Sequence, residues 1–222
     1  MNSVQAWADG HGYDYRWEGD EFLARVPDWY EAKVSDRKPI VADLARLLWM
    51  QEVCGESVDA VVWLDADTLI FEPGALSITP GDWSDTCQYG VEYWLQEDDR
   101  GRRRIYRNVH NAYCAFKPES HMLPFLIEAV MRLVMRADAQ HIPPQFVGPK
   151  LLTSLYNLLQ FDVDERLGAI SPLFAQDILK GSVGSGDILA ANLCASLESE
   201  MNHTELIAKL MAGCQGIERP SV

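Results

Sequence analysis

Residues 61–71, with the sequence VVWLDADTLIF, are the stretch that decides the fold class of this chain. An apolar segment ends abruptly at Asp65 and Asp67, two carboxylates one residue apart, and the chain then becomes apolar again. A run that is apolar on both faces is typical of a strand buried in a parallel sheet with helices on each side. The predicted fold class is therefore α/β. Asp65 and Asp67 would stand at the carboxyl end of the strand, where open α/β sheets bind their ligands.

The spacing of Asp65 and Asp67 suits a cation. Alternate side chains of an extended segment point to the same face, so two hard oxygen donors at i and i+2 can approach one metal ion. We therefore predict that this pair is the chemical centre of the protein.

Composition indicates a single domain with an ordinary, ordered interior. The 222 residues are 48% hydrophobic and 23% charged, which predicts one domain spanning residues 1–222. Lysine and arginine number 19 against 33 aspartates and glutamates, a formal charge of −14. This balance argues against nucleic acid or an anionic membrane as a main partner. An anionic ligand would need a metal ion or a cluster of arginines.

Cysteine usage and the chain's N-terminal residues predict a cytoplasmic protein. The five cysteines form no Cys-x-x-Cys pair, and an odd number in apolar surroundings indicates reduced, buried thiols. No basic segment followed by an apolar core is visible near Met1, so no signal peptide is expected. No run reaches the length of a membrane span, so no transmembrane segment is predicted. The cysteines are Cys54, Cys87, Cys114, Cys194 and Cys214.

Hydrophobic periodicity and turn residues predict the remaining elements. Helices are expected at 3–12, 39–55, 121–137, from Pro149 onward, and over 187–214. Strands are expected at 13–17, 60–64, 88–94, 108–116, 161–163 and 169–170.

The predicted helix 39–55 carries Asp43 and Arg46 at the edge of its apolar stripe. One interpretation is an ion pair on the helix surface. In the other, the pair belongs to the functional site, because the helix leads directly into strand 60–64 and its flank would lie close to Asp65. The spacing supports both interpretations.

The densest positive charge of the chain lies in residues 97–104, which include Arg100, Arg102, Arg103 and Arg104. Arginines in such a cluster can bind phosphates or an anionic acceptor. A solvated hairpin tip, balanced by its own acidic neighbours, explains the same residues equally well.

Four of these segments together resemble the metal-dependent GT-A glycosyltransferases. Residues 42–46 (ADLAR), followed by a strand ending in 65–67 (DAD), are similar to the DXD-containing group that includes the bacterial toxin glucosyltransferases and the yeast initiating mannosyltransferase type. Residues 111–118 (NAYCAFKP) resemble that group's strand after the DXD, and 148–153 (GPKLLT) resemble its Gly-Pro-x-x-x-Thr segment. The resemblance extends over approximately residues 3–156.

The resemblance implies a single GT-A-like, Rossmann-like domain. Its central sheet would be mostly parallel and flanked by helices, and its C-terminal part would be helical. The family's first strand, whose end binds the nucleotide base, is expected to be missing or truncated.

The resemblance also implies an activity, namely retaining transfer of a sugar from a UDP- or GDP-sugar donor to a glycan, lipid-linked or protein acceptor. Asp67 would bind Mn²⁺ or Mg²⁺ directly, and Asp65 would contact the ribose and reach the metal through water. Asp43 and Arg46 would hydrogen-bond the donor sugar. A divalent cation that bridges the two phosphates would stabilise the charge of the departing diphosphate.

The C-terminal metal ligand that the resemblance implies has no clear counterpart in the sequence. Asp177, Asp187 and His203 are candidates for a further metal ligand, but a structural role is expected for each. The acceptor is predicted, from position alone, to bind between residues 92–110 and the C-terminal helices.

Two other functions fit parts of the same sequence. In a haloacid-dehalogenase-type phosphatase, whose first motif is also a strand followed by Asp-x-Asp, Asp65 would be the nucleophile and Asp67 the acid/base. Lys150 or Lys180 would then have to supply the lysine, and the helix with Asp43 and Arg46 would be unexplained. A non-catalytic relative that binds a sugar nucleotide or a protein partner is the third interpretation.

Overall fold

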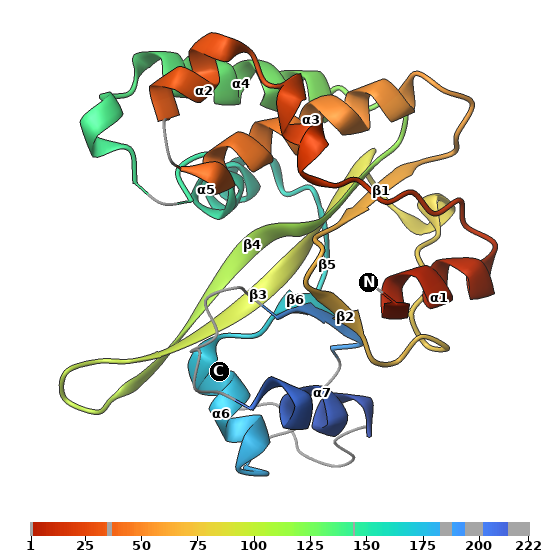
Figure 1. The fold of residues 1–222 in the computed structure, drawn as a ribbon, viewed down its shortest axis with the longest axis vertical. Coiled ribbons are helices and arrows are strands. Elements are labelled where there is room, and N and C mark those ends of the chain that lie inside the picture. Colours follow the sequence, from red (N-terminus) through yellow and green to blue (C-terminus); the bar gives the residue numbers. More distant parts are fainter. Residues whose placement is uncertain (1, 35–36, 144, 183–187, 194–201, 213–222) are drawn as a thin grey trace.

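The computed structural model of this chain describes residues 2–34, 37–143, 145–182, 188–193 and 202–212, and it combines helices with two small mixed sheets (Figure 1). The larger sheet has the strand order β1-β4-β3-β5, formed by Val61–Leu64, Arg103–Phe116, Cys87–Glu97 and Asp162–Asp164. The smaller sheet has the order β2-β7-β6, formed by Thr68–Ile70, Ala190–Asn192 and Leu167–Ala169. The predicted α/β class is therefore confirmed at this level.

The predicted mostly parallel central sheet is wrong. Strand β4 pairs antiparallel with both β1 and β3, and β2 pairs antiparallel with β7. Among the described strands, only β3 with β5 and β6 with β7 run parallel. For β3 and β4 the physical reason is their connection, a short turn at 98–102 in which the Asp98 N–H donates to the Arg102 carbonyl. Two strands joined by such a short turn pair antiparallel. The Rossmann-like arrangement is thus not confirmed.

Strand β1 is nevertheless in contact with apolar side chains on both of its faces, which explains its continuous apolar sequence. Val61 and Trp63 pack into one hydrophobic cluster, whereas Val62 and Leu64 pack against a second one. A two-sided core does not by itself determine strand direction, so the same apolar run is compatible with an antiparallel neighbour.

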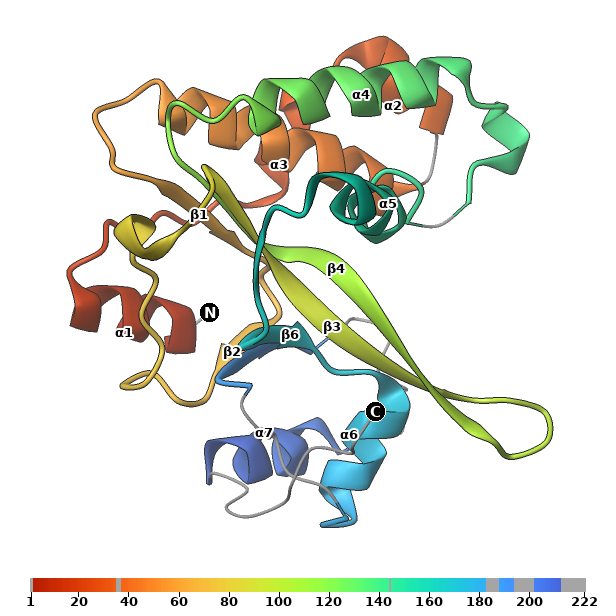
Figure 2. The same cartoon turned by 180° about the vertical axis from the view of Figure 1, so that it is seen from behind.

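Seven helices are described. They are α1 (Asn2–His11), α2 (Asp28–Val34), α3 (Lys38–Cys54), α4 (Met122–Arg136), α5 (Pro149–Leu159), α6 (Pro172–Leu179) and α7 (His203–Met211). Short 3-10 helices span Asp20–Arg25, Pro80–Asp82 and Ala139–His141. Helices α2 to α5 form a layer on one side of the larger sheet, and α6 and α7 lie beside the smaller sheet (Figures 1 and 2).

The helices predicted at 3–12, 39–55 and 121–137, and the one beginning at Pro149, are confirmed. Proline suits the first turn of a helix, because its missing N–H would have no partner there, and both α3 and α5 begin in this way. The strands predicted at 60–64, 88–94, 108–116, 161–163 and 169–170 correspond to β1, β3, β4, β5 and β6 with shifted ends.

Two predicted elements are wrong. Residues 13–17 form no strand but an irregular segment, held by a hydrogen bond from the Tyr13 hydroxyl to the Ile78 carbonyl and by an Arg16–Glu56 ion pair. Tyr13 and Tyr15 pack against a hydrophobic cluster without a partner strand. Within the predicted helical region 187–214, the structure instead places β7 and the shorter helix α7, and 194–201 and 213–214 lie outside the described residues.

The thiols in the described part of the chain are unpaired. Cys87 and Cys114 are buried, and burial raises the pKa of each thiol to about 12, so both stay protonated; Cys54 is partly buried. Cys194 and Cys214 lie outside the described residues. Within the described ranges, no helix is both long and apolar enough to cross a membrane.

Candidate functional site

A bulge in β4 forms the centre of the candidate site. Tyr89 of β3 opposes Cys114, but the next residue, Gly90, opposes His110, so residues 111–113 are extra on β4. Bulges of this kind redirect side chains and main-chain groups and are common beside active sites. Here the Asn111 side chain and the carbonyls of Asn111 and Ala112 bond to groups of α3 and of Asp65, at the end of β1.

Arg46 of α3 ties these elements together. Its Nη1 donates to the Asn111 carbonyl at 2.7 Å and its Nη2 donates to Asp65 Oδ1 at 2.8 Å. The guanidinium lies over the Trp63 ring, 5.3 Å from its centroid. Arg46 is only 6% exposed, and although burial acts to lower its pKa, Asp65 and Asp43 outweigh this and raise it. The interpretation of Asp43 and Arg46 as a surface ion pair is therefore wrong.

Asp43, one turn before Arg46, is enclosed by the bulge and by the start of α5. Asn111 Nδ2 donates to its Oδ1 at 2.6 Å, and Arg46 Nη1 lies 3.7 Å from the same oxygen. Burial raises the pKa of Asp43 to about 6, while Arg46 and Asn111 act to lower it. A Cβ on Gly148 would lie 2.8 Å from Asp43 Oδ2, so the glycine of the Gly-Pro segment makes room for this carboxylate.

Asp65 follows β1 and is held by three groups. Its N–H donates to the Ala112 carbonyl at 2.9 Å, which continues the pairing of β1 with β4. Its Oδ1 accepts from Arg46 and, at 2.7 Å, from the Trp63 indole N–H. The side chain is 27% exposed, so one edge of the carboxylate still faces the cleft described below.

Asp67 lies between the two sheets and is exposed. Its carbonyl accepts from the Leu193 N–H at 3.0 Å, and its Oδ1 accepts a short hydrogen bond from Asn192 Nδ2 of β7. Asn192 was not among the predicted site residues. It is separated from Asp67 by 125 positions and lies in a segment predicted to be helical, so no local signal connects the two. The one available hint is a polar residue inside the apolar run Leu189–Leu193.

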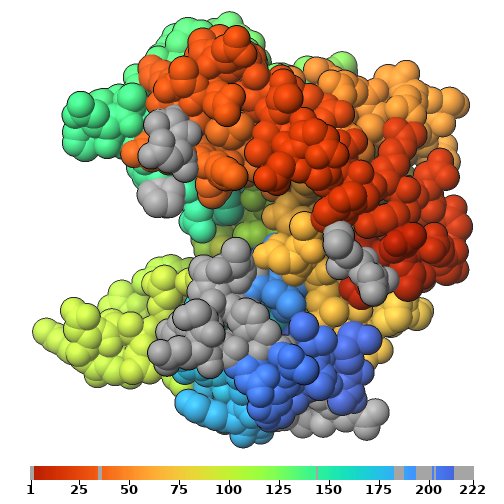
Figure 3. All heavy atoms as spheres, viewed as in Figure 1, coloured from red at the N-terminus to blue at the C-terminus, as the bar shows by residue number. Residues whose placement is uncertain are grey.

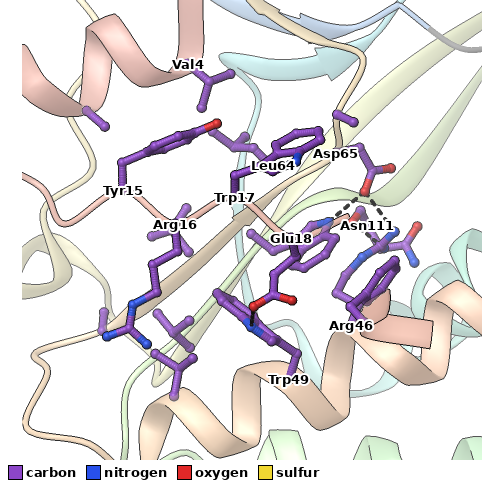
Figure 4. A pocket seen from close by; sticks show the side chains of 18 of the residues that line it. Val4, Tyr15, Arg16, Trp17, Glu18, Arg46, Trp49, Leu64, Asp65 and Asn111 are labelled. Atoms are coloured by element: carbon purple, nitrogen blue, oxygen red, sulfur yellow. Dashed lines mark hydrogen bonds and ion pairs between the residues drawn. The ribbon is translucent and has the colours of Figure 1, made fainter. Parts of the chain in front are cut away.

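These residues line one large open cleft of about 1440 Å³. Pockets that bind small ligands typically measure about 300–1,000 Å³, so a nucleotide-sized ligand fits here. The irregular segment 12–19 forms one wall, with Trp17 51% exposed. Figure 4 labels the side chains on both sides of this cleft, which are Tyr15, Arg16, Trp17 and Glu18 of the irregular segment and Arg46, Trp49, Asp65 and Asn111 facing them.

His110 and Glu92 form a buried polar pair at the edge of the cleft. His110 Nδ1 accepts from the Ala112 N–H at 3.0 Å, which places the proton of the neutral ring on Nε2, 3.8 Å from Glu92 Oε2. Burial lowers the pKa of His110 to about 4. Burial raises the pKa of Glu92 to about 6, although Asn108 donates to its Oε1 at 3.1 Å. His110 is therefore neutral at pH 7.

Other predicted residues lie elsewhere. Asp177 accepts from Arg103 Nη1 at 2.7 Å, so this buried carboxylate has the structural role expected for it. Asp187 lies outside the described residues, as does the side chain of His203. Arg102 pairs with Asp98 at 2.8 Å, as expected for a balanced hairpin tip.

Neither the metal-ligating residue types at the site nor the comparisons with other proteins identify its ligand. Among the described residues, no group of three or more histidines, cysteines, aspartates or glutamates is placed to hold a metal ion. Comparisons of the chain with protein-family models, with curated proteins and with solved structures found no match.

Proposed function

We propose that the cleft binds a nucleotide sugar together with a divalent cation, and that the protein is a glycosyltransferase. The observation that carries this proposal is the convergence of Asp43, Arg46, Asp65 and Asp67 on one cleft. Three of them are joined directly through the Arg46 guanidinium. These are the same residues for which the sequence resembles GT-A enzymes.

The donor atoms around Asp67 fit a hard cation. Asp65 and Asp67 supply carboxylate oxygens. The oxygen and nitrogen of the Asn192 carboxamide are assigned from hydrogen bonding, and a flip of this carboxamide would add a neutral oxygen as a third donor. We assign the metal to Asp67 and Asn192, with Asp65 as the further carboxylate. Bound there, Mn²⁺ or Mg²⁺ would neutralise charge on the diphosphate of the donor.

The roles of Arg46 and Asp43 follow from their existing contacts. Both terminal nitrogens of Arg46 already donate hydrogen bonds, to Asn111 and Asp65. We therefore assign Arg46 to holding Asp65 in position, and not to a direct contact with the ligand. Asp43 lines the cleft beside it and is the better candidate to accept a hydrogen bond from a sugar hydroxyl. Trp17, an exposed aromatic side chain in the cleft wall, is suited to stack on a base or sugar ring.

The phosphatase alternative has less support. That chemistry needs a lysine near the nucleophilic aspartate, and no lysine is among the described residues that line the cleft. Lys150 lies exposed in the first turn of α5. Asp65 Oδ1 is also bound to Arg46 and Trp63, which reduces its nucleophilicity.

The acceptor is proposed to bind along the β3–β4 hairpin, which projects from the body beside a hollow (Figure 3). Paired positions of antiparallel strands share a face, and faces alternate along each strand. The residues that share a face with the cleft residue His110 are therefore Glu92, Asn108, Trp94, Tyr106, Gln96 and Arg104. This face combines aromatic rings with hydrogen-bonding groups, as a sugar acceptor requires.

The proposal can be tested by thermal unfolding with a panel of UDP- and GDP-sugars, with and without Mn²⁺. We expect at least one sugar nucleotide to raise the melting temperature only when Mn²⁺ is present. Asp67→Ala should abolish this rise while the fold survives, because Asp67 is exposed and not part of the core.

Asp99→Ala is the matched control, because it removes the same charge from the exposed hairpin tip. It should leave the metal-dependent rise unchanged. Absence of any metal-dependent stabilisation in the wild type would refute the proposed function, and stabilisation without turnover would favour a non-catalytic binding protein.

A further inference from the structure

A small cavity lies beside Asp43 and Arg46, which also line the cleft. Its volume is about 20 Å³, and it is bounded by α3, α4, α5 and the two long strands. Most of its wall is apolar, formed by side chains such as Leu126, Val130 and Leu152. Four polar residues also contribute to it, namely Asp43, Arg46, Tyr89 and Asn111.

Two residues of this wall each carry a buried polar atom that has no hydrogen-bond partner. Among the described residues, the buried side-chain atoms without a partner are Arg46 Nε, Tyr89 Oη and Thr68 Oγ1. The first two belong to residues of the same cavity. Buried polar atoms are almost always hydrogen-bonded, so two unpaired atoms on residues of one cavity indicate a shared hydrogen-bond partner.

We propose that the cavity binds one structural water molecule that links Tyr89 to Arg46. A cavity needs about 10–15 Å³ of such volume and two to four polar partners to hold a water, and both conditions are met. The water would accept from Arg46 Nε–H and from the Tyr89 hydroxyl, and it would donate to the Asp43 carboxylate. Burial holds the pKa of Tyr89 well above its usual value, so its hydroxyl keeps the proton that this arrangement uses.

This water makes Tyr89 a positioning residue of the candidate site. The other two nitrogens of the Arg46 guanidinium are already bound, to Asn111 and Asp65. With Nε satisfied as well, the guanidinium is fixed along every edge and cannot rotate away from Asp65. Tyr89 thus acts on Asp65 through the water and Arg46. The water site does not depend on the proposed function; only its effect on ligand binding does.

A high-resolution crystal structure of the full chain tests the water directly. We expect a single density peak within hydrogen-bond distance of both Arg46 Nε and Tyr89 Oη. A cavity without density, or an Arg46 Nε bonded directly to a protein group, would overturn the proposal.

Tyr89→Phe tests the positioning role, because the ring still fills its place in the core and only the hydroxyl is lost. Tyr30→Phe is the matched control: this buried tyrosine of α2 loses a direct hydrogen bond to the Ile40 carbonyl at 3.3 Å and lines neither the cavity nor the cleft. By NMR, hydrogen exchange of the Arg46 Nε–H should become at least severalfold faster in Tyr89→Phe and stay unchanged in Tyr30→Phe. Equal exchange in wild type and Tyr89→Phe would contradict the link.

Ligand binding provides the functional readout. Tyr89→Phe should weaken Mn²⁺-dependent sugar-nucleotide binding by about tenfold, as loss of a supporting residue at a metal site commonly does, and Tyr30→Phe should not. Unchanged binding in Tyr89→Phe would refute the positioning role. If the wild type binds no sugar nucleotide, the proposed function fails, but the crystal structure and the exchange measurement still decide the water site.

Discussion

Gly148→Ala provides a stringent test of the geometry around Asp43. The new Cβ would lie 2.8 Å from Asp43 Oδ2 and 3.4 Å from Asn111 Nδ2. Ordinary contacts begin at 3.4 Å, so the carboxylate would have to move by at least 0.6 Å (3.4 − 2.8). Asp43 cannot turn away freely, because its Oδ1 is held by Asn111 and lies near Arg46.

Overpacking of a rigid site typically destabilises a protein by about 1–3 kcal/mol, and we expect Gly148→Ala to fall in this range. Urea unfolding followed by fluorescence measures the change, with an unaltered slope showing that the unfolded state is unaffected. Gly81→Ala is the control, because a Cβ there meets nothing within 4 Å. It should change stability by no more than about 0.5–1 kcal/mol, towards higher stability if at all.

A double-mutant cycle with Asp43→Ala identifies the cause. Truncation of Asp43 opens the space that the new methyl group needs, so the two substitutions should couple by at least about 1 kcal/mol. If Gly148→Ala and Gly81→Ala unfold with the same urea midpoint, the view that Asp43 is held rigidly is refuted.

Two further predictions concern the hairpin. The folded-state pKa of Glu92, about 6, exceeds its ordinary value of 4.5, so the stability that Glu92 contributes is complete below pH 4.5 and is lost as the pH rises through 6. Glu92→Gln should therefore be more stable than the wild type by up to about 2 kcal/mol at pH 8 and little changed at pH 4.5. Equal urea midpoints of the two proteins at pH 8 would contradict this. Tyr106→Ala should raise the KM for oligosaccharide acceptors severalfold. Ile105→Ala should not, because Ile105 lies on the opposite face, although its side chain is equally exposed at 44%. Equal effects of the two substitutions would exclude an acceptor on the face shared with His110.

Local sequence signals predicted the elements that depend on local interactions. Pro39 and the apolar stripe of α3 set its start and its buried side, because helix capping and periodicity act within a few residues. The apolar run before Asp65 correctly indicated contact with core on both faces of β1. The pairing of Asp43 with Arg46 was also visible as a three-residue spacing.

Other features were decided by tertiary structure alone. The direction of β1 relative to β4 and the extra residues 111–113 depend on how distant segments pair, and neither leaves a periodic trace in the sequence. The burial of Arg46 depends on that bulge, since its partner carbonyl belongs to Asn111.

By itself, therefore, the sequence determined where Asp65 and Asp67 stand in the chain and that an apolar strand precedes them. Only the tertiary structure decided what surrounds them: Arg46 and Trp63 on Asp65, and Asn192, 125 residues away, on Asp67. The physical reason is that hydrophobic periodicity encodes which face of an element is buried, whereas hydrogen bonds between distant side chains form only after strand order and register bring them together.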